Sequence, residues 1–203
     1  MLAHERVRAL KTGALGSSFN VRAVAQLARR HEGVPLIVDP VMIATRSPGG
    51  ARLLDDEALA SMNDLASRAT LVTPNVDEAE ALLCGTIRDE RDQREAASML
   101  VARGARAALV KGGHLHGDDA ADVLATRTGV VRLATRRERT RPFHGGGCTL
   151  AALVAGKLAT MTWRGRPGDD DLVSAARWAK RRLSAAIRRP LRVGSGLLVL
   201  DPR

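Results

Sequence analysis

Seven residues, Val34-Pro35-Leu36-Ile37-Val38-Asp39-Pro40, give the clearest indication of the fold class. The first five are almost entirely apolar, which is typical of a strand that is buried on both faces of a parallel sheet. The strand ends at Asp39-Pro40, because proline has no backbone N–H for the hydrogen-bond ladder. Asp39 is therefore a polar side chain at the end of a predicted buried strand.

Helical and strand patterns alternate on both sides of this segment, which is typical of βαβ units around a mainly parallel sheet. Apolar periodicity predicts helices at residues 20–31, 55–66, 75–83, 93–103, 147–159 and 169–188. Short apolar runs predict strands at residues 34–38, 70–73, 107–110 and 195–200, and an antiparallel hairpin at residues 121–126 and 130–134. We expect an α/β fold with helices on both faces of the sheet, built as one domain from residues 1–203.

The composition argues against a membrane protein and against a disulfide or metal scaffold. The chain is 45% hydrophobic and 27% charged, as globular proteins are. No apolar run approaches the roughly 18 residues that a membrane span needs, and the start lacks the apolar region of a signal peptide. Cys84 and Cys148 lie far apart and form no metal-binding spacing. We expect a cytoplasmic protein with no membrane partner, in which Cys84 is buried or half-buried.

The net charge of +10 raises the question of nucleic-acid binding, because basic surfaces attract phosphate backbones. The chain has no Tyr, two Phe and two Trp, which leaves few rings to stack on bases. Its arginines are spread along the predicted helices, so solvated helix faces explain them more simply. We expect no nucleic-acid partner. A small anionic substrate such as ATP would also be attracted by this charge.

Four unusual clusters fall at one edge of the predicted sheet, where ligands bind in folds of this type. They are residues 39–41, 73–75, 111–114 and 144–148. In the last cluster, glycines before a helix let backbone N–H groups point at one centre, where the helix dipole favours an anion. A flexible loop is the structural alternative. An esterase oxyanion hole would need a GxSxG motif, which the chain lacks, and no phosphate-binding P-loop spacing is present.

Four side chains in or near these clusters are candidates for chemistry. Cys148 lies at a helix start, where its thiolate would be stabilised and could take a proton from a substrate hydroxyl. A small core cysteine is the alternative. Asn75 and Glu78 could present oxygen atoms to magnesium, or could simply cap a helix. Lys111, at a strand end before two glycines, could reach a phosphate.

The chain resembles the hydroxymethylpyrimidine/phosphomethylpyrimidine kinases of thiamine biosynthesis, in the ribokinase superfamily. Five motifs carry the resemblance: KTGAL at residues 11–15, VDPVM at 38–42, LVTPNVDEA at 71–79, LVKGGH at 109–114 and HGGGCTL at 144–150. They follow the family's order, although the family's glycine loop usually reads HGTGC. The family also has strands and an SGGAGIQAD-like segment before KTGAL, so we expect this chain to lack the family's N-terminal segment.

The resemblance implies a ribokinase-like fold and an enzyme that phosphorylates hydroxymethylpyrimidine and then its monophosphate, with ATP and Mg²⁺. It implies that Cys148 is the catalytic base and that Gly145, Gly146 and Gly147 form the anion hole. The other implied contacts are Lys111 and Asn75 with ATP, Asn75 and Glu78 with magnesium, Ala176 and Lys180 with adenine, and Val41 and Asp39 with the pyrimidine.

Two alternatives to this function stay open. One is a kinase for pyridoxal-type substrates, and the other is a non-catalytic nucleotide-binding remnant without a substrate pocket. A cysteine at the position of the base argues against sugar kinases, which generally have aspartate there. The resemblance also implies a homo-oligomer, and an apolar sheet edge would favour self-association.

Overall fold

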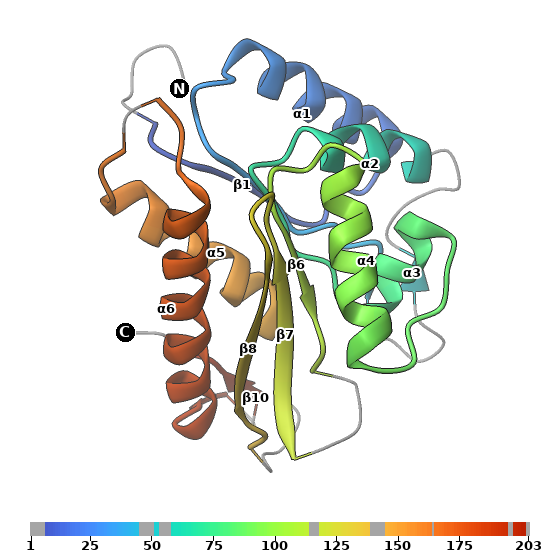
Figure 1. Cartoon of the computed structure of the whole chain (residues 1–203). Coiled ribbons are helices and arrows are strands. Elements are labelled where there is room, and N and C mark those ends of the chain that lie inside the picture. The colour runs from blue at the N-terminus through green and yellow to red at the C-terminus, as the bar shows by residue number, and fades with distance from the viewer. Residues whose placement is uncertain are drawn as a thin grey trace.

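A mixed six-stranded sheet forms the centre of the computed structural model, which describes residues 7–44, 51–52, 58–113, 118–138, 145–163, 165–194 and 197–201 (Figure 1). In spatial order the strands are β1 (Leu10–Thr12), β2 (Leu36–Val38), β5 (Leu71–Val72), β6 (Ala108–Lys111), β7 (Asp119–Ala125) and β8 (Val130–Arg136). The first four are parallel neighbours, and β7 and β8 add to β6 as an antiparallel hairpin. The mainly parallel sheet and its hairpin are therefore confirmed.

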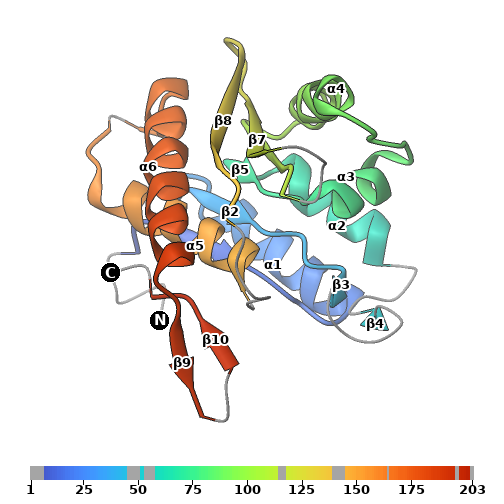
Figure 2. The ribbon, with the colours of Figure 1, turned by 90° about the horizontal axis from the view of Figure 1, so that it is seen from below.

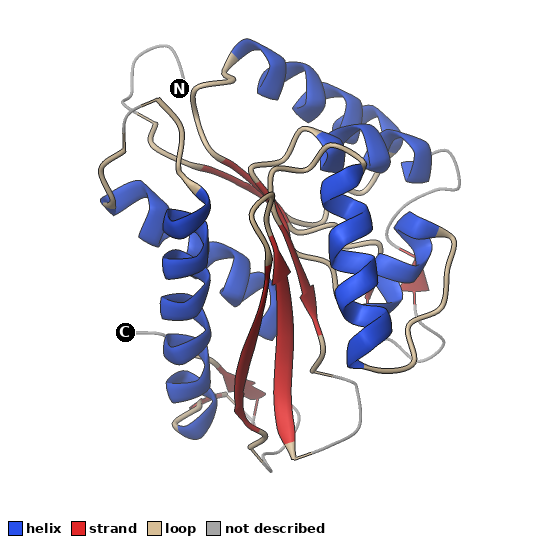
Figure 3. Cartoon of the chain, viewed as in Figure 1, coloured by secondary structure: helices blue, strands red, loops and turns tan. Residues whose placement is uncertain are grey.

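Helices cover both faces of this sheet, as predicted (Figures 2 and 3). They are α1 (Ser18–Arg30), α2 (Ala58–Ser67), α3 (Val76–Leu83), α4 (Glu90–Ala102), α5 (Gly146–Thr160) and α6 (Asp169–Arg188). The first four enclose one apolar core against the sheet, and α5 and α6 enclose the other. Among the described helices, none is long and apolar enough to cross a membrane.

The alternation of side chains along the strands decides which face each residue meets. On β6, Ala108 and Val110 belong to the core under α1–α4, whereas Leu109 belongs to the core under α5 and α6. Lys111 continues the series on the face of Leu109. The same period directs Asp122 of β7 to that face, because Leu124 lies in the core under α5 and α6. The alternation of side chains therefore places Lys111 and Asp122 on the same face of the sheet.

Local capping fixes several helix starts. Ser17 caps α1 by accepting the N–H of Asn20, and Asp89 caps α4 by accepting the N–H of Asp92. The second cap explains why α4 begins at Glu90, ahead of the predicted start at residue 93. The bounds predicted for α6 are confirmed.

Four short strands form two further two-stranded sheets. They are β3 (Ile43–Ala44) with β4 (Ala51–Arg52), and β9 (Leu191–Val193) with β10 (Leu197–Val199). Strand β10 lies inside the predicted strand at residues 195–200. The other three have no counterpart among the predictions, because strands of two or three residues carry too few side chains for a periodic pattern.

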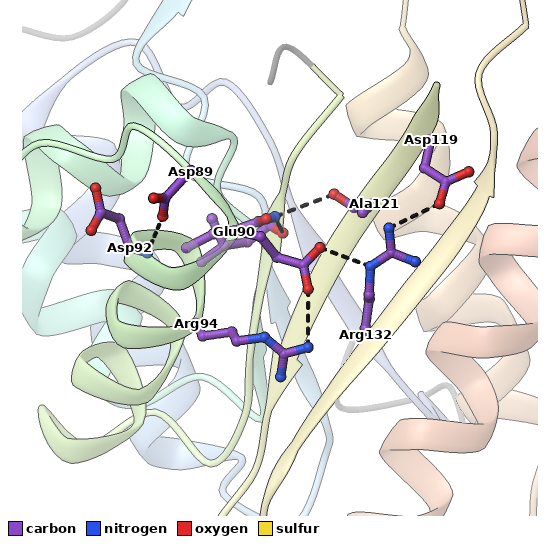
Figure 4. Close-up of polar contacts among 9 residues, drawn as sticks. Asp89, Glu90, Asp92, Arg94, Asp119, Ala121 and Arg132 are labelled. Atoms are coloured by element: carbon purple, nitrogen blue, oxygen red, sulfur yellow. Dashed lines mark hydrogen bonds and ion pairs between the residues drawn. The ribbon is translucent and has the colours of Figure 1, made fainter. Parts of the chain in front are cut away.

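Surface arginines tie α4 to the hairpin (Figure 4). The carboxylate of Glu90 accepts hydrogen bonds from Arg132 at 2.8 Å and from Arg94 at 3.0 Å. Arg132 also donates to Asp119 at 2.9 Å. These arginines, Arg132 foremost, hold the pKa of Glu90 below its ordinary value. The pairs are exposed, so each stabilises the fold only slightly. They show that some of the chain's arginines form ion pairs with surface carboxylates.

Cys84 is exposed, so the expectation that it is buried or half-buried is wrong. It is the C-cap of α3 and has a φ of 55°, in the left-handed region where a helix commonly ends. The chain turns away from the core at this point, which leaves the side chain in solvent.

Gly112 lies too close to β7 to accept a side chain, and this gives a test of the packing. An added Cβ would collide with the carbonyl oxygen of Ala121 and lie 2.7 Å from Nε2 of Gln93. We predict that Gly112→Ala lowers the free energy of unfolding by at least about 2 kcal/mol, the scale of overpacking. Gly113→Ala is the matched control, because nothing lies within 4 Å of its Cβ. Urea denaturation measures both, and equal losses would contradict the packing.

Candidate active site

The predicted clusters meet at the carboxyl edge of the parallel strands. Asp39 follows β2, Asn75 follows β5, Lys111 ends β6, and the glycine-rich cluster starts α5. The Nζ of Lys111 lies 3.0 Å from Oδ1 of Asp39, and an added Cβ on Gly147 would lie 2.8 Å from the same Nζ. Three clusters therefore converge on one ammonium group. The histidines at 114 and 144 lie outside the described residues.

Lys111 is the centre of this site. Its side chain is 13% exposed and lies between the carboxylates of Asp39 (1%) and Glu78 (5%), with Oε2 of Glu78 at 3.7 Å. Removing an ammonium group from water is unfavourable unless paired charges surround it, and here two carboxylates do so. A side chain at position 147 would push the ammonium away from its present place.

Glu78 is held in place by the start of α3. Its carboxylate accepts the backbone N–H of Asn75 at 2.7 Å, and Oδ1 of Asn75 accepts the N–H of Glu78 at 2.8 Å. This capping box satisfies two free donors at the helix start. Burial raises the pKa of Glu78 to about 6, and the charges of Asp39 and Asp77 add to the rise, against the opposing effect of Lys111. The site therefore holds a carboxylate that is reluctant to ionise.

The start of α5 is open to an anion. Gly145 is the N-cap, with a φ of 84°, and it offers no side chain to cap the helix. Helix geometry leaves the N–H groups of Gly146, Gly147 and Cys148 without acceptors inside the helix. These donors and the positive end of the dipole lie beside Lys111, so the arrangement suits a phosphate group.

Cys148 is exposed, so it is not a core residue. Its expected thiolate stabilisation is wrong for the structure as it stands. Partial burial and the negative charge of Asp39 raise the pKa of the thiol above its ordinary value. Lys11 and Lys111 oppose this rise without cancelling it. Burial, and after it a carboxylate more than a hundred residues earlier in the chain, thus favour the protonated thiol despite its place at a helix start.

Lys11 is a member of the site that the sequence analysis did not single out. Its Nζ lies 3.6 Å from Oδ2 of Asp39, so Asp39 sits between two ammonium groups. Thr73 also donates to Oδ1 of Asp39, at 3.4 Å. The KTGAL motif was the available signal, because Lys11 stands one residue before the end of β1, at the same edge as Asp39.

The predicted adenine contacts need correction. Ala176 is fully buried in the core between α6 and the sheet, so it has no surface for an adenine ring. Lys180 as a whole residue is 8% exposed, and its Nζ lies 2.7 Å from Oδ2 of Asp122. Val41 is half-buried and its backbone N–H donates to the carbonyl of Asp39 at 2.8 Å, so it does lie beside the site. Its contact with a pyrimidine stays a prediction.

The residues at this edge fit a magnesium ion that is held largely by phosphates and water. In the described part of the chain, no group of three or more His, Cys, Asp or Glu side chains could hold a metal ion. Oδ2 of Asp39 is buried without a hydrogen-bond partner among the described residues, and Glu78 lies close by. One or two carboxylates are what magnesium usually takes from a protein at a phosphate site. Asn75 is engaged in the capping box instead.

Sequence comparisons identify relatives of the chain. The profile of a family described as phosphomethylpyrimidine kinase matches residues 1–201. A hydroxymethylpyrimidine/phosphomethylpyrimidine kinase of Rhizobium meliloti is 40% identical over 192 residues, which cover 94% of this chain and 68% of the relative. The thiamine biosynthesis bifunctional protein ThiED of Geobacter sulfurreducens is 39% identical over 191 residues, covering 94% of this chain and 37% of that protein. The chain thus spans about two thirds of the kinase and little more than a third of the bifunctional protein.

Solved structures show the same fold. The pyridoxal kinase of Staphylococcus aureus in complex with AMP-PCP and pyridoxal superposes with a TM-score of 0.81 and 26% identity, over 96% of this chain and 67% of that one. A phosphomethylpyrimidine kinase of Clostridium difficile gives a TM-score of 0.70 and 28% identity, over 89% and 69%. Both are small-molecule kinases by name, and the ribokinase-like fold expected from the sequence is confirmed.

The raised pKa of Glu78 predicts a pH dependence of stability in magnesium-free buffer. A carboxyl group whose pKa is higher in the folded state favours folding below its unfolded pKa, near 4.5, and loses this contribution as the pH rises through about 6. A shift of about 1.5 units corresponds to about 2 kcal/mol. Glu78→Gln keeps an acceptor for Asn75 and removes the titration. The difference in unfolding free energy, wild type minus variant, should fall by that amount between pH 4 and pH 7; parallel curves would contradict this assignment.

Proposed function

Because this chain belongs to the phosphomethylpyrimidine kinase family, we propose that it transfers the γ-phosphoryl group of ATP to hydroxymethylpyrimidine and then to its monophosphate. The observation that carries the proposal is the half-buried ammonium of Lys111 beside the uncapped start of α5. Phosphoryl transfer depends mainly on positioning and on charge stabilisation around the moving group. The Lys111 ammonium and the neighbouring backbone N–H donors of α5 supply both positioning and charge stabilisation.

The glycines, Lys111, Cys148 and the two carboxylates have distinct roles in this reaction. The N–H groups of Gly146 and Gly147 hold oxygens of the γ-phosphoryl group, and Lys111 offsets the charge that grows on the bridging oxygen. The substrate hydroxyl oxygen attacks phosphorus, the bond to ADP breaks, and the hydroxyl proton passes to Sγ of Cys148 in its thiolate form. Magnesium, when bound, would supply charge neutralisation of the phosphates. Glu78 and Asp39 are the carboxylates placed to hold it.

A pyridoxal-type substrate is the second candidate, because pyridoxal kinases superpose with the higher TM-scores among the structures compared. The deciding experiment incubates the purified chain with ATP and magnesium, and with either hydroxymethylpyrimidine or pyridoxal. Formation of the phosphorylated pyrimidine, followed by chromatography, supports the proposal. Faster turnover of pyridoxal would show that the substrate is of the pyridoxal type. A folded protein that binds ATP but turns over neither compound would support the non-catalytic alternative.

Three further expectations belong to the same proposal: one kinase domain, a cytoplasmic location and self-association. Strand β1 ends the described sheet on one side, and such an edge favours pairing with another chain. Light scattering across a concentration series tests self-association. A mass that stays monomeric at every concentration would contradict it.

Cys148→Ala should lower kcat by about 100-fold or more, the usual effect of losing a positioned base, with little change in the affinity for ATP. The physical reason is that the thiolate touches the reacting hydroxyl, whereas ATP is held by other groups. Cys84→Ala is the matched control, because the second cysteine is also exposed but lies at the end of α3. Steady-state kinetics with hydroxymethylpyrimidine measure both. Unchanged turnover in Cys148→Ala would show that Cys148 is not the catalytic base.

A further inference from the structure

A second buried ion pair lies beside the site and has no role in the reaction described above. Nζ of Lys180, from α6, is 2.7 Å from Oδ2 of Asp122, on β7. The two side chains are 10% and 3% exposed. Burying two charges is unfavourable unless they are held in good geometry, so such a pair is weak evidence for stability alone. Its position suggests another purpose, because Asp122 is the cross-strand partner of Lys111.

The same carboxylate also holds the backbone that carries Lys111. Oδ1 of Asp122 accepts the N–H of Gly112 at 3.2 Å. Because Lys180 occupies Oδ2, the carboxylate cannot rotate freely, and Oδ1 stays directed at Gly112. The turn that follows β6 is therefore joined to α6 through one carboxylate.

The opposite face of the sheet holds this turn as well. Nε2 of Gln93 donates to the carbonyl of Val110 at 2.8 Å and to that of Ala121 at 3.3 Å; the acceptor on Ala121 is visible in Figure 4. The residues before and after Lys111 are thus fixed from two sides, Val110 by α4 and Gly112 by Asp122. The ammonium of Lys111 can then be placed accurately although its own side chain is long and flexible.

We propose that Asp122 and Lys180 are positioning residues for the nucleotide phosphates. They touch no ligand; they hold the amide of Gly112 and thereby the point from which Lys111 reaches its phosphate. The inference rests on the proposed function in one respect, that the anion beside Lys111 is a phosphate of ATP. It also gives Lys180 a role that differs from the predicted contact with adenine.

Paired substitutions test this without leaving a lone buried charge. Asp122→Asn with Lys180→Met removes both charges and keeps an oxygen that accepts the N–H of Gly112. Asp122→Leu with Lys180→Met removes both charges and the acceptor. We expect the dissociation constant of ATP, measured by calorimetry, to rise at least about tenfold in the Leu/Met variant and to stay within about threefold in the Asn/Met variant.

Two further measurements separate positioning from folding. Urea denaturation checks that both variants are folded, and hydrogen exchange at the Gly112 amide, followed by NMR, should quicken only in the Leu/Met variant. Equal ATP affinities in the two variants would overturn the proposal, as would unchanged exchange at Gly112. If the wild type binds ATP but phosphorylates no pyrimidine, the proposed reaction fails while the affinity difference still supports positioning. If the wild type binds no ATP, both fail.

Discussion

The pairing of the half-buried Lys111 ammonium with two carboxylates is the interaction on which the site depends. An ammonium group at 13% exposure needs anionic neighbours; Asp39 supplies one directly after β2, and Glu78 supplies the other from the first turn of α3, which follows β5. These groups can meet only because β2, β5 and β6 are adjacent and parallel, with their carboxyl ends at one edge. With the ammonium in this place, a side chain at position 147 would collide with it. The Lys111 ammonium therefore contacts both the carboxylates that the strand order brings together and the glycine at the start of α5.

The strand period extends this arrangement across the sheet. Lys11, Asp39, Lys111 and Asp122 all fall on the face covered by α5 and α6, and their charges alternate in sign from β1 to β7. Lys180 of α6 continues the alternation at 2.7 Å from Asp122. Each charge thus has a neighbour of opposite sign, which offsets the loss of water on a face that is otherwise apolar. The arginines of the outer surfaces have no such constraint and form exposed pairs.

Burial and the charge of Asp39 favour the protonated form of two groups at the site. The pKa of Glu78 and that of the Cys148 thiol are both raised, in each case by burial first and by the charge of Asp39 second. Positive charge brought to this edge would lower both values, because it favours the ionised form of each group. A base that ionises more readily when a magnesium-bound nucleotide arrives is consistent with a kinase.

The sequence by itself determined the features that depend on neighbouring residues. The order of the helices and of strands β2, β5, β6, β7 and β8, the bounds of α6, the capping motif at Asn75 and Glu78, and the glycine-rich start of α5 all follow from patterns a few residues long. What only the tertiary structure decided is the environment of each charge. Lys111 and Asp39 are 72 positions apart and Lys180 and Asp122 are 58 apart, so no local pattern records these pairs. For the same reason the sequence could not show that Ala176 is buried, or that Asp39 raises the pKa of Cys148: burial and electrostatic fields are summed over residues that become neighbours only when the sheet forms.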